Sequence, residues 1–228
     1  MRIWVTRTRP SADSVSVILE ASGFRVINAP VIEVSPTNEP VPRSQCDVAI
    51  FLSAHAVRHA FQNHRIQCPN IVSIGATTRK TLEKYGMRSE IPALSSTEGL
   101  VSFLKDRFHQ KSSILLVSGL GGRQDLGVWL DQIGHVVLRW CVYKRTPIYP
   151  FICQKIDLIE VASGEALKAV LKNPSIGNFF GMETPLCVPS QRIANMALQY
   201  GFSKVLLSAG AAPSDLLSSL SENEFISR

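Results

Sequence analysis

Short apolar runs alternate with segments of helical periodicity along the whole chain. The apolar runs have the length of buried strands and predict strands at 2–6, 25–28, 47–52, 70–74, 88–91, 113–118, 135–140, 157–162, 186–188 and 204–207. In the intervals, apolar residues recur at helical spacing and predict helices at 12–22, 54–62, 77–85, 97–109, 123–133, 164–171, 191–200 and 213–220. This alternation is typical of parallel sheets whose faces are covered by helices.

The chain contains an internal repeat. The segment 72–86 matches 187–201 at a constant offset of 115, and both copies end in a Tyr-Gly pair. At a similar offset, Ser53 and Ser163 occupy matching places after an apolar run. The repeat divides the chain into four segments, 1–34, 47–104, 112–143 and 157–220. One short and one long segment together make a five-stranded doubly wound domain of ordinary size.

Two connectors that contain prolines indicate how these segments combine, which the repeat alone leaves open. Residues 29–38 and 139–150 each hold a short apolar run near prolines, as expected of extended crossing strands rather than tight turns. Two such linkers side by side would join two lobes. We therefore expect an outer lobe formed by 1–34 and 149–228, with a middle lobe, 39–143, inserted into it.

Small and polar residues follow the predicted strands, where doubly wound sheets bind their ligands. Free N–H groups and hydroxyls at the following helix N-termini bind carboxylates or phosphates. The residues that we expect to bind an acidic ligand are Thr6, Arg7, Ser53, His55, Gly75, Thr77, Thr78, Gly119, Gly121, Gly122, Arg123, Ser163, Ser190 and Arg192. Any single Ser or Thr among them is better explained by helix capping than by ligand binding. Their recurrence in both halves of the chain favours a shared anionic ligand.

Several enzyme classes lack their signatures in this sequence. The glycine turn 118–122 has neither the GxGxxG of dinucleotide-binding proteins nor the GK[ST] of P-loops. Neither a GxSxG elbow nor paired carboxylates follow the predicted strands, which argues against hydrolytic acid–base chemistry. His55 and His59 have a spacing that can bind metal, but no third ligand accompanies them. We therefore interpret them as partly exposed histidines and expect no metal.

Charge and cysteine content indicate which class of partner the protein binds and which cellular compartment it occupies. The chain has 24 Lys and Arg against 18 Asp and Glu, a net charge of +6 that favours an anionic partner. These basic residues are scattered, which argues against nucleic acid. The five cysteines are odd in number and form no CxxC pair, as expected of unpaired thiols in a reducing compartment. Without a secretion signal or a bilayer-length apolar run, we expect a cytoplasmic protein with no membrane association.

Motifs in a fixed order resemble the uroporphyrinogen-III synthase family. They are 3–7 (IWVTR), 51–57 (FLSAHAV), 73–78 (SIGATT), 96–100 (STEGL), 121–123 (GGR), 142–143 (VY), 163–164 (SG) and 188–194 (VPSQRIA). Each motif is weak alone, but their order and spacing extend over nearly the whole chain. The resemblance implies an α/β fold of two flavodoxin-like lobes, each a doubly wound parallel sheet, joined by a two-stranded β-ladder.

The resemblance also implies a function in haem biosynthesis. The linear tetrapyrrole hydroxymethylbilane would be cyclised to uroporphyrinogen III, with inversion of ring D and loss of water. The enzyme would be a monomeric lyase without cofactor or metal, supplied with substrate by the upstream bilane synthase. Tyr143 would face the cleft and assist departure of the ring A hydroxyl. The residues that would meet the substrate's acetate and propionate groups are Ser53, Thr77, Thr78, Ser163 and Ser190.

Three features depart from the family's pattern. Ser118 stands where many members carry Arg, Ala162 replaces a common Thr, and the segment 144–162 is short, which indicates a missing helix in the outer lobe. From the residues alone, Tyr143 is explained equally well by packing and by function. The alternative function is a two-lobed, non-catalytic binding protein for a polyacidic small molecule. Binding without any change in product isomer would distinguish that alternative.

Overall fold

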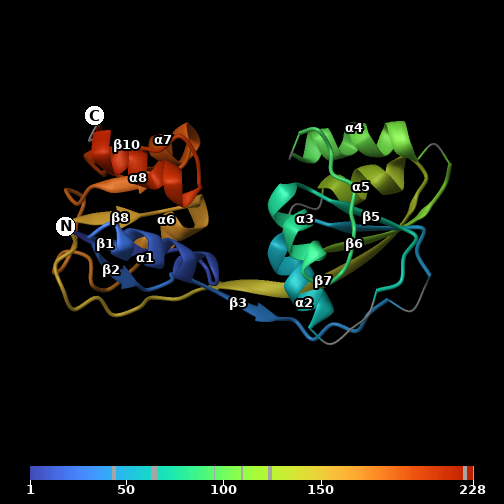
Figure 1. The fold of residues 1–228 in the computed structure, drawn as a ribbon, viewed down its shortest axis with the longest axis horizontal. Coiled ribbons are helices and arrows are strands. Elements are labelled where there is room, and N and C mark those ends of the chain that lie inside the picture. Colours follow the sequence, from blue (N-terminus) through green and yellow to red (C-terminus); the bar gives the residue numbers. More distant parts are fainter. Residues whose placement is uncertain are drawn as a thin grey trace. The chain divides into compact units, whose positions relative to one another are not determined.

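The apolar runs of the sequence form two separate sheets in the computed structural model, which describes residues 1–42, 45–62, 66–94, 96–108, 110–122, 125–222 and 225–227. Unit 1 comprises Met1–Glu33 and Thr146–Arg228, and unit 2 comprises Val34–Arg145. Each unit has its own sheet and its own helices (Figure 1). Among the described residues, none of the helices has the length and hydropathy needed to cross a bilayer.

Unit 1 is built on one β-sheet. Its strands are β1 (Arg2–Val5), β2 (Arg25–Asn28), β8 (Leu158–Glu160), β9 (Leu186–Val188), β10 (Lys204–Leu207) and β11 (Phe225–Ser227), in the spatial order β11-β10-β9-β8-β1-β2. Neighbouring strands are parallel, except that β11 runs antiparallel to β10. The helices are α1 (Ser11–Ala21), α6 (Gly164–Leu171), α7 (Gln191–Gln199) and α8 (Pro213–Glu222).

Alternation along β1 divides the core of unit 1 into two layers. Ile3 and Val5 pack with α1 and α8 on one face of the sheet, while Trp4 packs with α6 and α7 on the other. This is the period of two expected of a strand that is buried on both faces. The ends of its parallel strands therefore lie next to helices from both layers.

Unit 2 has the same construction. Its strands are β3 (Ile32–Pro36), β4 (Val48–Phe51), β5 (Asn70–Ser73), β6 (Ser113–Gly119) and β7 (Val136–Pro147), in the order β3-β7-β6-β4-β5. Its helices are α2 (Ala54–Phe61), α3 (Ala76–Glu83), α4 (Thr97–Arg107) and α5 (Asp125–Gln132). Apolar residues of α2 and α3 cover one face, and those of α4 and α5 cover the other.

The chain passes from one unit to the other within β3 and returns within β7. The N–H of Ile148 donates to the carbonyl of Val31 (2.9 Å), and the N–H of Thr37 donates to that of Val142 (3.3 Å). The two strands therefore run in opposite directions and form the expected two-stranded ladder. The expected fold class, two doubly wound parallel sheets joined by a ladder, is confirmed.

Most predicted elements begin and end within about two residues of the observed ones. The repeat is also structural, because 72–86 forms β5 and α3 in unit 2 while 187–201 forms β9 and α7 in unit 1. In both copies a glycine in the left-handed region follows the end of the helix, with φ of 75° at Gly86 and 100° at Gly201.

Three predictions about elements need correction. The strand at 88–91 is wrong, since only Glu90 pairs there, in a single bridge to Val72. Pro92 has no N–H with which to continue that ladder. The separate strand and connector predicted over 135–150 are one strand, β7, and β11 was not predicted. Residues 148–157, all of which the structure describes, form neither helix nor strand.

Candidate functional site

Tyr143 occupies the last part of β7 that pairs with β6 in unit 2. Pairing shifts by one residue between Ser118 and Gly119, so that Gly119 lies opposite Tyr143. This bulge re-aims the side chain, and Tyr143 joins Val142 in the apolar cluster under α2 instead of pointing to the opposite face. The Tyr143 side chain is only 6% exposed.

The Tyr143 ring lies directly against the backbone of Gly119. A Cβ at residue 119 would approach Tyr143 Cζ to 2.5 Å and its hydroxyl oxygen to 2.9 Å. The N–H of Leu120 also donates to the Tyr143 carbonyl (2.7 Å), which fixes the backbone on both sides of the ring. Only glycine at position 119 allows the ring to take this place.

The Tyr143 hydroxyl is hydrogen-bonded to Ser53 at the start of α2. Tyr143 Oη and Ser53 Oγ are 3.1 Å apart, and either can donate. Ser53 is the N-cap residue, and its Oγ accepts the N–H of Ala56 (3.0 Å). A hydroxyl has one proton and two lone pairs, so Ser53 can accept from the helix and still donate to Tyr143.

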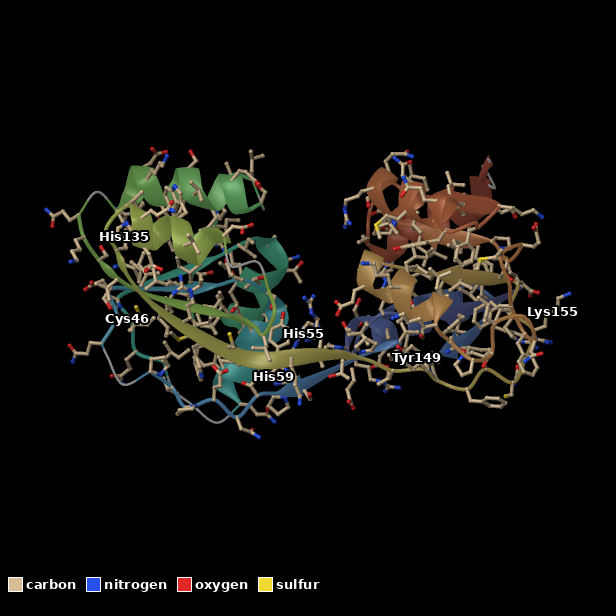
Figure 2. The ribbon with its side chains drawn as sticks, turned by 180° about the vertical axis from the view of Figure 1, so that it is seen from behind. Cys46, His55, His59, His135, Tyr149 and Lys155 are labelled. Atoms are coloured by element: carbon tan, nitrogen blue, oxygen red, sulfur yellow. The ribbon has the colours of Figure 1, made fainter. Side chains whose placement is uncertain are left out.

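His55 and His59 flank the Tyr143 ring from α2, where they are four positions apart on one helix face. Their ring centroids lie 5.6 Å and 5.7 Å from that of Tyr143, and the His59 ring is stacked on it. Figure 2 shows both histidines beside β7. Both histidines are partly exposed, as predicted. Their contact with Tyr143 could not be predicted from spacing, because it depends on the bulge in β7.

Both imidazoles are held in the neutral form at pH 7. Burial lowers the pKa of His55 to about 4, and the charges of Arg58, His59 and Arg145 act in the same direction. Burial and Arg58 also lower the pKa of His59. Among the described atoms, His59 Nδ1 is buried without a hydrogen-bond partner. The two imidazoles that flank Tyr143 are therefore neutral at pH 7, and the positive charges near them are those of Arg58 and Arg145.

Other predicted residues of unit 2 follow β5 and β6. Gly75 is the buried N-cap residue of α3, with Thr77 exposed and Thr78 buried in the first turn. Gly121 has a φ of 71°, and the N–H of Gly122 donates to the Gly119 carbonyl (3.2 Å), which closes the turn after β6. Arg123, also predicted to bind the ligand, lies outside the described residues.

In unit 1, the two predicted residues after β1 form internal contacts. Thr6 Oγ1 donates to the Glu160 carbonyl (2.7 Å). Arg7 Nε donates to Glu160 Oε1 (2.7 Å), and its Nη1 donates to the Ala211 carbonyl (2.7 Å). The side chains of Arg7 and Glu160 are 9% and 2% exposed. The sequence did not predict this ion pair, and ligand binding by Thr6 and Arg7 stays a prediction.

Burial raises the pKa of the Glu160 carboxyl, while the Arg7 guanidinium opposes that shift. Within the described residues, Glu160 Oε2 is buried without a partner. Arg7 therefore joins the loop after β1 both to Glu160 at the end of β8 and to the loop after β10, which contains Ala211.

The remaining predicted residues of unit 1 lie at two helix N-termini. Ser163 caps α6 by accepting the N–H of Ala166 (3.1 Å), the same arrangement as Ser53 in unit 2. Ser190 is the N-cap residue of α7, and in the described part of unit 1 its side chain makes no capping hydrogen bond. Arg192 is exposed, with its Nη1 3.7 Å from Met196 Sδ.

The two units thus differ in the chemical groups that lie at the ends of their strands. Unit 2 brings Ser53, His55, Gly119 and Tyr143 together in one cluster, whereas unit 1 offers separate helix N-termini. In the part of the chain that the structure describes, no three His, Cys, Asp or Glu side chains are grouped so that they could hold a metal ion.

Comparisons with known proteins agree with one another. A family model described as uroporphyrinogen-III synthase HemD matches residues 13–218. A uroporphyrinogen-III synthetase structure from Helicobacter pylori has a TM-score of 0.65 at 14% identity, covering 97% of this chain and 99% of its own. A mutant uroporphyrinogen III synthase from the extremely thermophilic bacterium Thermus thermophilus has a TM-score of 0.62 at 13% identity, covering 98% and 100%.

Proposed function

Because the chain belongs to the uroporphyrinogen-III synthase HemD family, we propose that it is a cofactor-free lyase whose reaction is centred on Tyr143. Membership of this family makes the chain an enzyme of haem biosynthesis that acts on a small tetrapyrrole. The reaction is the cyclisation of hydroxymethylbilane to uroporphyrinogen III, with inversion of ring D and loss of water. The observation that supports the assignment to Tyr143 is its hydroxyl, bonded to a helix-capping serine among neutral rings.

The reaction requires the loss of one hydroxide and then strict control of the conformation of the tetrapyrrole. Loss of hydroxide from ring A leaves an azafulvene cation. The substituted α-carbon of ring D attacks this cation to form a spiro intermediate, which fragments and recloses with ring D inverted. Direct attack by the free α-carbon gives the wrong isomer, so the protein must hold one bent conformer.

Tyr143 is suited to assisting the first step. When Ser53 donates its own proton to Tyr143 Oη, the phenolic proton is available to the departing hydroxyl of ring A. The neutral rings of His55 and His59 place no positive charge beside the cation that forms. A protonated imidazole at either position would oppose that charge.

The acetate and propionate groups of the substrate require many hydrogen-bond donors. We assign this binding to the helix N-termini that follow the strands, where N–H groups and hydroxyls attract carboxylates. The residues concerned are Thr6, Arg7, Ser53, His55, Gly75, Thr77, Thr78, Gly119, Gly121, Gly122, Arg123, Ser163, Ser190 and Arg192. The net charge of +6 supports binding of a polyacid in general.

We further propose that the protein works in the cytoplasm as a monomer and receives hydroxymethylbilane from the upstream bilane synthase. All five cysteines, each within the described residues, are free thiols, which fits a reducing compartment. An unstable linear substrate also favours delivery close to where it is produced.

The test is the isomer composition of the product. Purified protein is mixed with hydroxymethylbilane, and the products are oxidised and separated chromatographically into types I and III. We expect type III to predominate over the type I product that forms without enzyme. Formation of type I alone would reject the function, and tight binding of the bilane in that case would favour a non-catalytic binding protein.

A further inference from the structure

Two cysteines of unit 2 lie in direct contact. Cys46 Sγ is 3.0 Å from Cys68 Sγ, to which it donates, and Cys68 Sγ is 3.2 Å from the Cys46 carbonyl oxygen. All five cysteines belong to the part of the chain that the structure describes. Among these five, Cys46 and Cys68 have sulfur atoms in contact. The sequence, with no CxxC motif, predicted only unpaired thiols.

The register of the sheet explains why these two residues meet. Strands β4 and β5 are parallel, with Val48 opposite Asn70, so two residues earlier Cys46 is opposite Cys68. The side-chain amide of Asn70 donates to the Asp47 carbonyl (2.9 Å) and extends the pairing towards the cysteines. Adjacent strands lie about 4.8 Å apart, inside the range of Cα separations that a disulfide spans.

We propose that Cys46 and Cys68 form a reversible disulfide, which makes this end of the unit 2 sheet a site of oxidative modification. The oxidant is a low-molecular-weight disulfide of the glutathione class. The site lies at the amino ends of β4 and β5, whereas Ser53 and Gly75 follow the carboxyl ends of the same strands. This inference is independent of the proposed function.

The two sulfurs have different roles in the exchange. Cys68 is partly exposed, whereas Cys46 is 8% exposed, so the oxidant reaches Cys68 first. The hydrogen bond from Cys46 lowers the pKa of the Cys68 thiol. The same hydrogen bond, together with burial, raises the pKa of Cys46. Cys68 is therefore the attacking thiolate, and Cys46 resolves the mixed disulfide.

The exchange balances without any further reactant. The Cys68 thiolate attacks one sulfur of the oxidant, whose S–S bond breaks and releases one thiolate, leaving a mixed disulfide on Cys68. Cys46 then transfers its proton to the released thiolate and attacks Cys68 Sγ, and the second low-molecular-weight thiolate departs and takes up the proton lost from Cys68. Two protein thiols lose two electrons in total, and one oxidant disulfide is reduced to two thiols.

Other cysteines serve as internal references. Cys153 is exposed and belongs to unit 1, so it reports general accessibility to glutathione. Cys187 is buried, and burial raises its pKa to about 12, which makes it unreactive. A Cys153→Ser variant leaves Cys46 and Cys68 untouched and is the matched control.

The experiment is peptide mapping of the full-length protein after equilibration with oxidised and reduced glutathione. Free thiols are alkylated and the protein is digested with trypsin without reductant. Cleavage at arginine separates 44–58, which contains Cys46, from 66–79, which contains Cys68. We expect these peptides to be linked, with a mass two hydrogens below their sum, in wild type and in Cys153→Ser. Dithiothreitol should separate them.

A second variant tests the order of the steps. In Cys46→Ser the resolving thiol is absent, so we expect glutathione to accumulate on Cys68 at least tenfold above wild type. A stable Cys68–glutathione adduct of equal yield in wild type would overturn the proposal. So would free Cys46 and Cys68 thiols under conditions in which Cys153 is fully glutathionylated.

Discussion

At the scale of single residues, the cluster around Tyr143 depends on a few atoms. The phenol oxygen has one identified partner, Ser53, and the ring is held by Gly119 and two imidazoles. Replacing any of these removes a different property: the acid proton, the space for the ring or the neutral imidazoles beside it. Each property can be tested separately.

Removing the phenolic oxygen tests the proposed acid. Tyr143→Phe keeps the ring and should lower kcat by about 100-fold or more, the usual contribution of a positioned acid. The lost hydrogen bond should cost only about 1 kcal/mol of stability. Steady-state kinetics of type III formation and urea denaturation provide the two measurements. Tyr149→Phe, an exposed residue of unit 1, is the control, and equal rates for both variants would assign Tyr143 to packing.

Adding a single methyl group tests the position of the ring. Gly119→Ala should displace Tyr143, since the new Cβ would lie 2.5 Å from Cζ. We expect kcat to fall about tenfold or more while the protein remains folded, because an ångström of misplacement is costly in catalysis. Gly181→Ala, whose Cβ would meet nothing within 4 Å, is the matched control. Wild-type kcat in Gly119→Ala would show that the ring position is unimportant.

Lowering the pH should reduce the stability of the folded protein, because His55 is held in its neutral form. Its pKa is lowered to about 4 in the folded protein, whereas the pKa of the unfolded side chain is near the ordinary value of 6.5. The unfolded state therefore binds more protons in this window, and stability falls as the pH falls from about 6.5 to 4. Urea denaturation across this range should give a smaller pH slope in His55→Gln than in wild type. An unchanged slope would contradict the neutral assignment.

At the scale of elements, polar contacts tie loops to strands in ways that the hydrophobic pattern does not reveal. The pattern predicted β4 and α2 because buried strands and amphipathic helices have a simple period. It also placed Ser53 and Ser163 at strand ends, where both cap helices. The Arg7–Glu160 pair could not be predicted, since 153 residues separate its members.

The contacts of the Tyr143 cluster could not be predicted from the sequence either. Sequence spacing placed Tyr143 on a crossing strand and His55 after another strand, but their contact depends on a shift in pairing between Ser118 and Gly119. A bulge leaves no period in the sequence that reveals it. The single bridge at Glu90 differs, because Pro92 was visible and signals the end of strand pairing.

The buried ion pair of unit 1 should be far more costly to break than a surface pair. Arg7→Met leaves Glu160 buried without its partner, which should destabilise the protein by about 3–5 kcal/mol. Arg79→Met, which breaks the exposed pair with Glu83, should cost below about 1 kcal/mol. Urea denaturation at neutral pH measures both, and similar losses would contradict the structural role of Arg7.

The same variant has a predictable pH dependence. Burial raises the pKa of Glu160 even with Arg7 present, and removal of Arg7 raises it further. The folded state then binds a proton more tightly than the unfolded state. The stability lost in Arg7→Met should therefore be regained in part as the pH falls below neutral. A deficit that is constant with pH would show that Glu160 is not the group concerned.

At the scale of the whole molecule, unit 2 is a continuous insertion in unit 1. The chain leaves unit 1 after Glu33 and re-enters it at Thr146. The Ile148 N–H donates to the Val31 carbonyl, so these two ends are neighbours on antiparallel strands. Each unit has its own two-layered core, which is the condition for independent folding.

Excising the insertion should leave a folded unit 1. We expect a chain in which Asn-Gly joins Glu33 to Thr146 to form a hairpin there, since a two-residue turn suits antiparallel strands. Far-ultraviolet circular dichroism and hydrogen exchange should show cooperative folding with protected β1 and β8 amides. The variant should form no type III product. A chain without exchange protection would mean that unit 1 requires unit 2.

The irregular pairing beside Gly119 has a consequence for variation in chain length. Because one residue of offset decides which side of the sheet receives the phenol, deleting or adding a residue in the stretch from Trp140 to Tyr143 would turn it towards α4 and α5. The stretch 148–157 forms neither helix nor strand, but Ile152 and Ile156 within it are buried in the core of unit 1. Engineering of this enzyme must therefore keep the residue count before the tyrosine unchanged, and any change of length within 148–157 must retain its two buried isoleucines.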